Sequence, residues 1–214
     1  RALSYTQVFD KVFIFDNSDS GSSHVVTSDG YIVEVLSENG NKGLPYAFNQ
    51  ILKRCEGFDF LCTLDQDSDF PPSEINSIKN YIANINTDDI GIIAPFIDYG
   101  IKSYSVSDIS EERRWVITSG SFVNLHVIRK ERIFYDENYF IDKFEIDLCE
   151  QLKNRNYRIV MYHGSTLHQE LGESNGHTHT NHSPLRHYYL FRNRFYFNKK
   201  WHIGIKRCFL NIAQ

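Results

Sequence analysis

The sequence of 214 residues contains a single methionine, Met161, and four cysteines that form none of the close pairs typical of metal or dithiol sites. No apolar run approaches the ~18 residues that a membrane-spanning helix requires. Cys55, Cys62 and Cys149 lie in apolar segments, which predicts buried reduced thiols in a cytosolic protein. The chain begins with Arg1, and we expect the natural N-terminus to lie upstream of it.

Signature motifs of several enzyme classes are also absent. The sequence has neither a G-x-G-x-x-G fingerprint nor a P-loop lysine motif, which disfavours dinucleotide oxidoreductases and P-loop kinases. The TSGS stretch, Thr118 to Ser121, does not have the G-x-S-x-G spacing of a nucleophile elbow either.

Acidic residues are missing from the last part of the chain. Residues 174–214 contain no Asp or Glu and seven Lys or Arg, whereas the other 173 residues contain 16 basic and 27 acidic side chains, a net charge of −11. This asymmetry predicts a tail that meets an anionic surface. Our first interpretation is that its aromatic side chains pack on the domain while Arg192 and Arg194 line a phosphate-binding edge. Contact with a membrane through 184–214 is the second interpretation, and RNA binding, which we do not expect, is the third.

Hydrophobic periodicity predicts strands that alternate with helices. The predicted strands are 12–15, 31–36, 60–64, 90–96, 115–125 with a break at Gly120, and 158–162. The predicted helices are 44–55, 73–85 and 144–157, with one or more further helices from Pro184 onward. This alternation indicates an α/β fold with a mostly parallel sheet flanked by helices. We expect one domain over 1–183 and a helical tail over 184–214 packed on or next to it.

An acidic cluster follows the predicted strand 60–64. Asp65 and Asp67 lie two residues apart, so one carboxylate could hold a sugar hydroxyl while the other coordinates a divalent cation. A solvated acidic turn with Asp69 as a helix cap is the alternative. Asp16 ends another predicted strand, and ligands of α/β sheets gather at the carboxyl ends of strands.

Seven segments in order resemble family 2 inverting glycosyltransferases of the GT-A fold, most closely their bacterial rhamnosyltransferase-like branch. These segments are FDNSDS, NGNKGLPYAFNQIL, LDQDSDFPP, ITSGSFVN, YFIDKFEIDLC, TLHQELG and SPLRHYYLFRNRF. Members of this family normally begin with a further strand and helix ahead of FDNS, so we expect the first strand of the fold to be missing here.

The resemblance implies roles for the strand-end acids. Asp16 would accept a hydrogen bond from a uracil or thymine N3–H, and Asp65, with Gln66 beside it, would bind the ribose. Asp67 would ligate Mg²⁺ or Mn²⁺ between the two phosphates of a nucleotide sugar, and His168 would complete that metal site. The alternatives are that Asp16 caps a turn and that His168 is structural.

Other histidines are rivals as metal ligands. His163 lies near His168 in the sequence, and His177, His179 and His182 form a histidine-rich tract whose Thr and Asn neighbours favour a hydrated loop.

Two polar loops complete the expected donor site. Asn39, Asn41 and Lys42 precede a predicted helix N-terminus, whose free N–H groups suit a phosphate or sugar hydroxyl. An ordinary Gly/Asn loop is the alternative. Ser119 and Gly120 offer a hydroxyl and a close backbone approach to a sugar.

A second acidic cluster would provide the catalytic base. By the resemblance this position reads Glu-Asp in many relatives with the second acid as base; here Phe144 replaces the first acid and Glu145 occupies the second position. If a helix begins here, Asp142 lies on the same face as Glu145, while Asp147 turns away. The base is therefore Glu145 or Asp142, and we favour Glu145. Acids that merely favour a helix dipole are the alternative.

The expected activity is metal-dependent, inverting transfer of a sugar from a nucleotide sugar to a hydroxyl of a glycan or lipid-linked glycan. The resemblance implies dTDP-L-rhamnose as donor and a bacterial surface polysaccharide as product, and UDP-hexoses are the first alternative. A sugar nucleotidyltransferase and a lipid- or RNA-binding module are the others. We expect a cytoplasmic protein, peripheral at the inner face of the membrane if the tail binds lipid.

Overall fold

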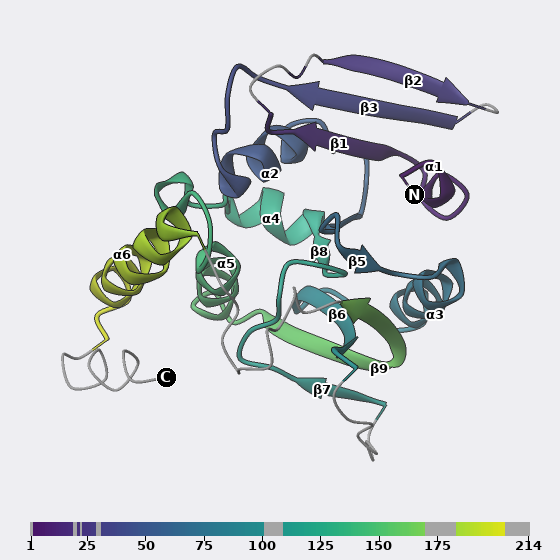
Figure 1. The fold of residues 1–214 in the computed structure, drawn as a ribbon. Coiled ribbons are helices and arrows are strands. Elements are labelled where there is room, and N and C mark those ends of the chain that lie inside the picture. Colours follow the sequence, from purple (N-terminus) through teal and green to yellow (C-terminus); the bar gives the residue numbers. More distant parts are fainter. Residues whose placement is uncertain are drawn as a thin grey trace.

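The computed structural model describes residues 2–18, 21, 23–28, 31–100, 109–169 and 183–203. Its strands form a three-stranded sheet, at the top of Figure 1, and a six-stranded sheet below it, with helices around both. None of the helices in these ranges combines the length and apolar character needed to span a lipid bilayer.

The three-stranded sheet has the order β1 (Val12–Asp16), β3 (Tyr31–Ser37) and β2 (His24–Ser28). β1 and β3 run parallel, as the sequence predicts, whereas β2 is an unpredicted strand that pairs antiparallel with β3. Phe13 and Phe15 of β1 pack with Ile51 of α2 (Leu44–Leu52). This sheet therefore rests on the predicted helix 44–55.

The six-stranded sheet has the order β4 (Phe60–Cys62), β8 (Phe122–Asn124), β6 (Ile90–Asp98), β9 (Arg158–Gln169) and β5 (Ser68–Asp69), with β7 (Ser110–Glu112) also paired to β9. Only β6 and β9 run parallel in it. The prediction of a mostly parallel sheet is therefore wrong, and both sheets are mixed. Strands of two or three residues are too short to show a hydrophobic period, so β5 and β7 were not predicted. β8 lies in the predicted strand 115–125, but its antiparallel direction was not predicted.

No strand pairing joins the two sheets in the described part of the chain, because β1 and β4 each pair with one neighbour only. Side chains connect them instead. Val12 of β1 packs in the same apolar cluster as Phe60 and Cys62, and Phe13 shares a cluster with Leu61. The apolar core is therefore continuous between two sheets that are hydrogen-bonded separately.

The predicted strand 115–125 is wrong for its first half. Residues 118–121 form a turn in which the Ser121 N–H donates to the Thr118 carbonyl at 3.1 Å, and Gly120 has a φ of +76°. A Cβ at Gly120 would lie 2.7 Å from Leu167 and 2.8 Å from Pro95, so this close approach requires glycine. The strand begins only at β8.

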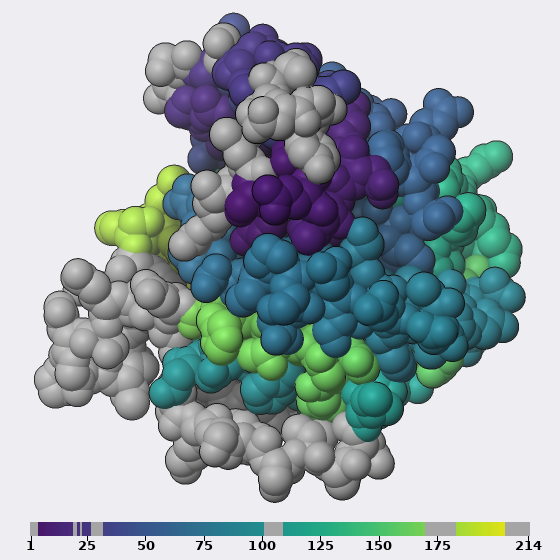
Figure 2. Space-filling view, turned by 90° about the vertical axis from the view of Figure 1, so that its right-hand side faces the viewer, coloured from purple at the N-terminus to yellow at the C-terminus, as the bar shows by residue number. Residues whose placement is uncertain are grey.

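The remaining elements are α1 (Ala2–Tyr5), α3 (Pro72–Ala83), α4 (Leu125–Glu131), the 3₁₀ helix η1 (Glu137–Tyr139), α5 (Phe144–Lys153) and α6 (Pro184–Lys200). In α3 the isoleucines Ile75 and Ile78 are fully buried, as their spacing predicts. Figure 2 shows the N-terminal residues (purple) against the blue surface of α3, where Lys79 donates to the Val8 carbonyl at 2.6 Å.

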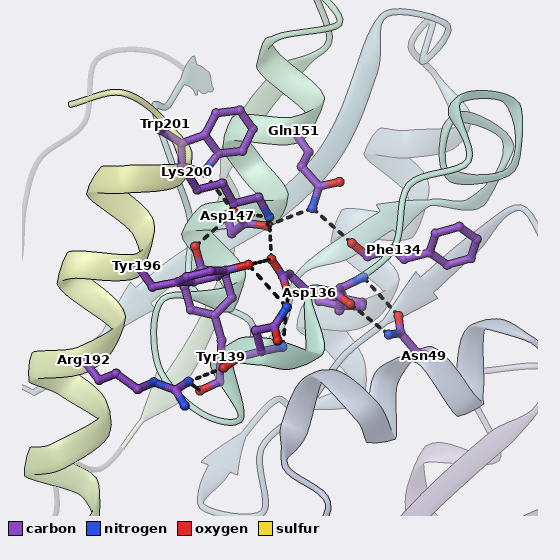
Figure 3. A network of polar contacts seen from close by, with 12 residues as sticks. Asn49, Phe134, Asp136, Tyr139, Asp147, Gln151, Arg192, Tyr196, Lys200 and Trp201 are labelled. Atoms are coloured by element: carbon purple, nitrogen blue, oxygen red, sulfur yellow. Dashed lines mark hydrogen bonds and ion pairs between the residues drawn. The ribbon is translucent and has the colours of Figure 1, made fainter.

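α6 is anchored by a buried polar network that Figure 3 shows from close by. Asp147 of α5 is fully buried, and its carboxylate accepts hydrogen bonds from the Lys200 amine, the Tyr139 hydroxyl, the Gln151 amide and the Trp201 indole. Buried charges are stable only when paired and hydrogen-bonded in this way.

The same cation reaches a second acid. The Lys200 amine lies 2.7 Å from the Asp136 carboxylate, which also accepts from the Tyr196 hydroxyl at 2.8 Å. Phe197 is buried in the main apolar cluster. In contrast, one stripe of α6 is exposed to solvent: Leu185, Tyr188, Phe191 and Phe195. The helix therefore packs on the domain along one face and presents rings along another.

Cys55 and Cys149 are buried free thiols, as predicted, and Cys62 is a partly buried one. Cys208 lies outside the described residues.

Candidate active site

The acidic loop after β4 is hydrogen-bonded to the turn 118–121. The Thr63 N–H donates to the Ser121 carbonyl at 3.1 Å, and the Gly120 N–H donates to the Thr63 carbonyl at 2.7 Å. Further along, the Asp65 N–H donates to the Ser119 hydroxyl oxygen at 3.1 Å. Two segments more than 50 residues apart in the sequence therefore form one unit.

Ser119 connects both ends of that loop. Its hydroxyl is buried and donates to the Ser68 hydroxyl at 2.6 Å, while Ser68 itself donates its N–H to the Asp65 carbonyl at 3.3 Å. Asp65 is partly buried, whereas Gln66 and Asp67 are exposed. The loop thus has a fixed backbone and an outward-facing tip.

The electrostatic surroundings of Asp65 extend to α6. Burial and, second, the neighbouring charge of Asp67 raise the pKa of the Asp65 carboxyl, while the charge of Arg186 lowers it. Arg186 also donates to the Asp142 carboxylate at 3.2 Å. The charge of one guanidinium therefore acts on both acidic clusters that the sequence identifies.

Asp142 belongs to a strained turn. Phe140, Asp142 and Lys143 have φ values of 64°, 59° and 71°, in the left-handed region that non-glycine residues rarely adopt. α5 begins only at Phe144, so Asp142 lies in the turn before the helix, and the prediction that it shares a helical face with Glu145 is wrong. Strain of this kind persists only where the surroundings enforce it, and it clusters at functional sites.

Glu145 lies in the first turn of α5 and is partly buried. Burial is the largest effect that raises the pKa of the Glu145 carboxyl, and the charge of Asp142 raises it further. The charge of Lys143 lowers it. Glu145 lines a small cavity together with Thr63, Thr118 and Ser121. The candidate base therefore faces the same turn that holds the Asp65 loop.

Comparison with protein-family models shows the family of this chain. Residues 2–211 match the family model described as glycosyl transferase family 2. The chain belongs to glycosyl transferase family 2. The match spans every segment on which the sequence resemblance rests.

Solved structures agree on the fold of this family 2 chain. The S. aureus TarS fragment 1–349 in complex with UDP has a TM-score of 0.54 at 13% identity, covering 78% of this chain and 52% of that one. S. aureus TarS has a TM-score of 0.50 at 14% identity, covering 65% of this chain and 26% of that one. The chain thus spans between a quarter and about half of the length of these structures. No curated protein sequence matches it significantly.

The Asp65 loop of this family 2 domain fits a divalent cation in part. Asp65 and Asp67 supply hard carboxylate oxygens at an open edge, and Mg²⁺ or Mn²⁺ in such sites takes one or two carboxylates and completes its shell with phosphate oxygens and water. In the described ranges no three His, Cys, Asp or Glu side chains converge on one point. A cation here would therefore depend on the donor diphosphate for several of its ligands.

His168 lies near this loop but has another partner. Its position in β9 is paired with Asp69 of β5, and its Nδ1 lies 3.3 Å from an Asp98 carboxylate oxygen. His163, the rival, is largely buried with Nε2 3.2 Å from Glu111. The tract His177, His179 and His182 lies outside the described residues.

Asp16 ends β1 and caps a turn. Its carboxylate accepts the Ser18 N–H at 2.9 Å, and hydrogen bonds from the Ser18 backbone and side chain lower the pKa of the Asp16 carboxyl. The other carboxylate oxygen lies against Gly21, where a Cβ would come within 2.6 Å of it. A side chain at position 21 would therefore have to displace the Asp16 carboxylate.

The loop before α2 is exposed at Asn39, Asn41 and Lys42. The Asn41 side chain accepts the Gly43 N–H at 2.9 Å, and the Leu44 N–H donates to the Phe140 carbonyl at 2.8 Å. The Leu44 N–H at the helix N-terminus is thus used by the strained turn, and the binding of a phosphate or sugar hydroxyl by this loop stays a prediction.

Sequence reasoning missed two residues of α6 at this site. Arg186 was not singled out, and Asn193 was not named, although a lone amide among the rings of YYLFRNRFYF is a detectable anomaly. Arg192, expected at a phosphate-binding edge, instead donates to the backbone carbonyls of Asn138 and Tyr139 and stacks on Tyr189. Its guanidinium therefore binds the backbone just before the strained turn.

Proposed function

We propose that this domain transfers a sugar from a pyrimidine nucleoside diphosphate sugar to an acceptor hydroxyl, with inversion at the anomeric carbon. The observation that supports this most strongly is Glu145, a carboxyl with a raised pKa that faces the turn to which the Asp65 loop is bonded. A base whose pKa approaches the working pH is the most effective in proton transfer.

In the proposed reaction Glu145 takes the proton of the acceptor hydroxyl as its oxygen attacks the anomeric carbon. The new bond joins the acceptor oxygen to that carbon, and the bond from the carbon to the diphosphate oxygen breaks, leaving its electron pair on the diphosphate. Asp142 is the alternative base. Its Oδ1 accepts a hydrogen bond from Arg186, and its Oδ2 is buried without a hydrogen-bond partner.

Stabilisation of the negative charge on the departing diphosphate is the second requirement. Asp67, Asp65 and the diphosphate would hold a Mg²⁺ or Mn²⁺ ion, which supplies positive charge to the leaving group when bound. Arg186 would add a second positive charge, because its charge lowers the pKa of Asp65 and its guanidinium donates to Asp142. Asp16 would accept the N3–H of the base, with Gln66, Asn39, Asn41, Lys42, Ser119 and Gly120 lining the donor site.

Two donors are candidates. The sequence resemblance favours dTDP-L-rhamnose, whereas the fold similarity to a TarS fragment in complex with UDP favours a UDP-sugar. Both share a pyrimidine N3–H for Asp16. The acceptor would be a hydroxyl of a growing bacterial surface polysaccharide or lipid-linked glycan.

Calorimetric titration with UDP and dTDP, with and without Mn²⁺, tests this function directly. We expect one nucleotide to bind more tightly in the presence of Mn²⁺, and Asp67→Asn to remove that dependence. Asp59→Asn is the matched control, because Asp59 is an exposed acid just before β4 with an ion pair to His126. Metal-independent binding in the wild type, or equal effects of the two variants, would reject the metal site.

Measurement of kcat separates an effect on the chemical step from an effect on donor binding. Glu145→Gln should lower kcat on the order of 10²- to 10⁴-fold, while Glu150→Gln, on the same helix in a surface pair with Arg114, should leave it essentially unchanged. Release of inorganic pyrophosphate from a nucleoside triphosphate would instead identify a sugar nucleotidyltransferase.

We also propose a cytoplasmic protein that contacts the inner face of the membrane through α6. The exposed stripe of Leu185, Tyr188, Phe191 and Phe195, on a segment without acidic residues, supports this. Co-sedimentation with anionic but not neutral vesicles, lost in Tyr188→Ser/Phe191→Ser, is the expected result.

A further inference from the structure

Two backbone carbonyls of the turn 140–143 and one just before it are gathered around one side chain. Asn193 of α6 is fully buried, and its Nδ2 group donates to the carbonyls of Tyr139, Ile141 and Asp142 at 2.9, 2.5 and 3.0 Å. An amide NH₂ has only two hydrogens, so at least one of them is shared between carbonyls.

The orientation of the Asn193 amide is fixed from its other end. Its Oδ1 accepts from the Nε and Nη2 atoms of Arg192 at 3.0 and 2.8 Å. Because the guanidinium only donates and the carbonyls only accept, the NH₂ must face the turn. Arg192 also donates to the carbonyls of Asn138 and Tyr139.

The turn is held from the opposite side by α2. The Leu44 N–H donates to the Phe140 carbonyl, and a Cβ at Gly43, whose φ is +88°, would lie 2.6 Å from that oxygen. Left-handed non-glycine residues persist only where their surroundings enforce them. Here hydrogen bonds from α2 and α6 together enforce the conformation of residues 140–143.

Asn193 is not needed to attach α6 to the domain. One to two turns further along, Phe197 is buried in the main cluster, and Tyr196 and Lys200 bind Asp136. A buried amide is costly unless every polar atom is paired, so its place among aromatic residues calls for a specific partner. That partner is the backbone of the turn that leads into Glu145.

We infer that Asn193 is a positioning residue, which holds the strained turn so that Asp142 and Glu145 face the acceptor and donor. This inference rests on the proposed function and adds to it a residue that touches neither substrate. The contacts of Asn193 are all with the turn and with Arg192, so its effect should reach turnover through the placement of the two acids.

The experiment measures UDP release from UDP-glucose, or dTDP release from dTDP-L-rhamnose, with Mn²⁺ and water as acceptor, using whichever donor the wild-type chain turns over. Asn193→Asp keeps the shape and removes the donor hydrogens. We expect kcat to fall at least tenfold, KM for the donor to change little, and the acid limb of the pH–kcat profile to shift. Tyr196→Phe, on the same helix, is the matched control and should keep the wild-type kcat and pH profile.

If Asn193→Asp does not fold, Asn193→Ser, which is smaller and keeps one hydroxyl donor, takes its place with the same expectations. A folded variant with wild-type kcat and pH profile overturns the inference. Glu145→Gln and Asp142→Asn separate this result from failure of the proposed function. If both keep the full kcat, the proposed base is wrong and the inference falls with it; if either loses kcat while Asn193→Asp does not, the inference alone fails.

Discussion

Replacing Lys200 by methionine tests the buried network that anchors α6. Methionine keeps the approximate length and apolar stem of the side chain but removes the amine that lies 2.7 Å from Asp136 and 2.8 Å from Asp147. Asp147 is fully buried, so in the variant its carboxylate has lost its cation without gaining water.

The expected loss follows from that geometry. Removing one partner of a buried pair typically costs about 3–5 kcal/mol because an uncompensated charge remains. Asp147 retains donors in Tyr139, Gln151 and Trp201, and Lys200 is about a quarter exposed, so we expect the lower end, about 3 kcal/mol of unfolding free energy. At this chain length that corresponds to a fall in Tm of roughly 6–12 °C.

Urea denaturation at pH 7 measures this change. Lys199→Met is the matched control, since Lys199 is the exposed neighbour on the same helix, and it should change stability by less than about 0.5 kcal/mol. Adding Asp147→Asn to Lys200→Met should recover part of the loss, because the orphaned charge is then neutral. Equal effects of Lys199→Met and Lys200→Met would refute the reasoning.

Three further outcomes are expected. Gly120→Ala should lower the unfolding free energy by about 1–3 kcal/mol in urea titrations, since its φ is +76° and Leu167 lies 2.7 Å from the new Cβ. Burial raises the pKa of Asp136, but hydrogen bonds from Lys200, Tyr196 and Asn138 outweigh it, so the net pKa is lowered from 3.8. This carboxyl therefore stabilises the fold above that pH, and its contribution is lost as the pH falls through the lowered value. Asp136→Asn should accordingly flatten the acid limb of a plot of unfolding free energy against pH. Because burial raises the pKa of Glu145 and the charge of Lys143 opposes this, kcat should fall with decreasing pH at a value above the usual 4.5, and Lys143→Met should move that limb to higher pH; an unchanged profile would contradict the assignment of Glu145 as base.

The helices and long strands were predictable because each shows its own period. Ile75 and Ile78 in α3 and the apolar run of β6 are local signals of burial. In contrast, the turn 118–121 depends on hydrogen bonds to Thr63, which lies 55 residues from Thr118 in the sequence. No local sequence pattern predicts a hydrogen-bond partner at that separation. The sequence did contain one unused signal: Asn124 caps α4 by accepting the N–H groups of His126 and Val127.

The candidate acids, and Ser119 beside Asp65, were named from the sequence, but the side chains of α6 that contact the acidic clusters were not. Asp65, Asp142 and Glu145 lie in two of the segments that resemble the family, and their roles remain predictions. The contacts of Arg186 and Asn193 with the acidic clusters arise because α6 folds back over the domain more than 40 residues later in the chain. Long-range placement of that kind is decided by packing and has no counterpart in periodicity or spacing.

The separate hydrogen bonding of the two sheets has a consequence for dynamics. In the part of the chain that the structure describes, no strand pairing joins the three-stranded sheet to its neighbour. It is therefore a natural unit of sub-global opening, and its amides should exchange with solvent faster than those of β6 and β9. Because Asp16 belongs to this smaller unit and Asp65 to the larger one, a nucleotide that touches both carboxylates would clamp the two together and slow that exchange in proportion to its occupancy.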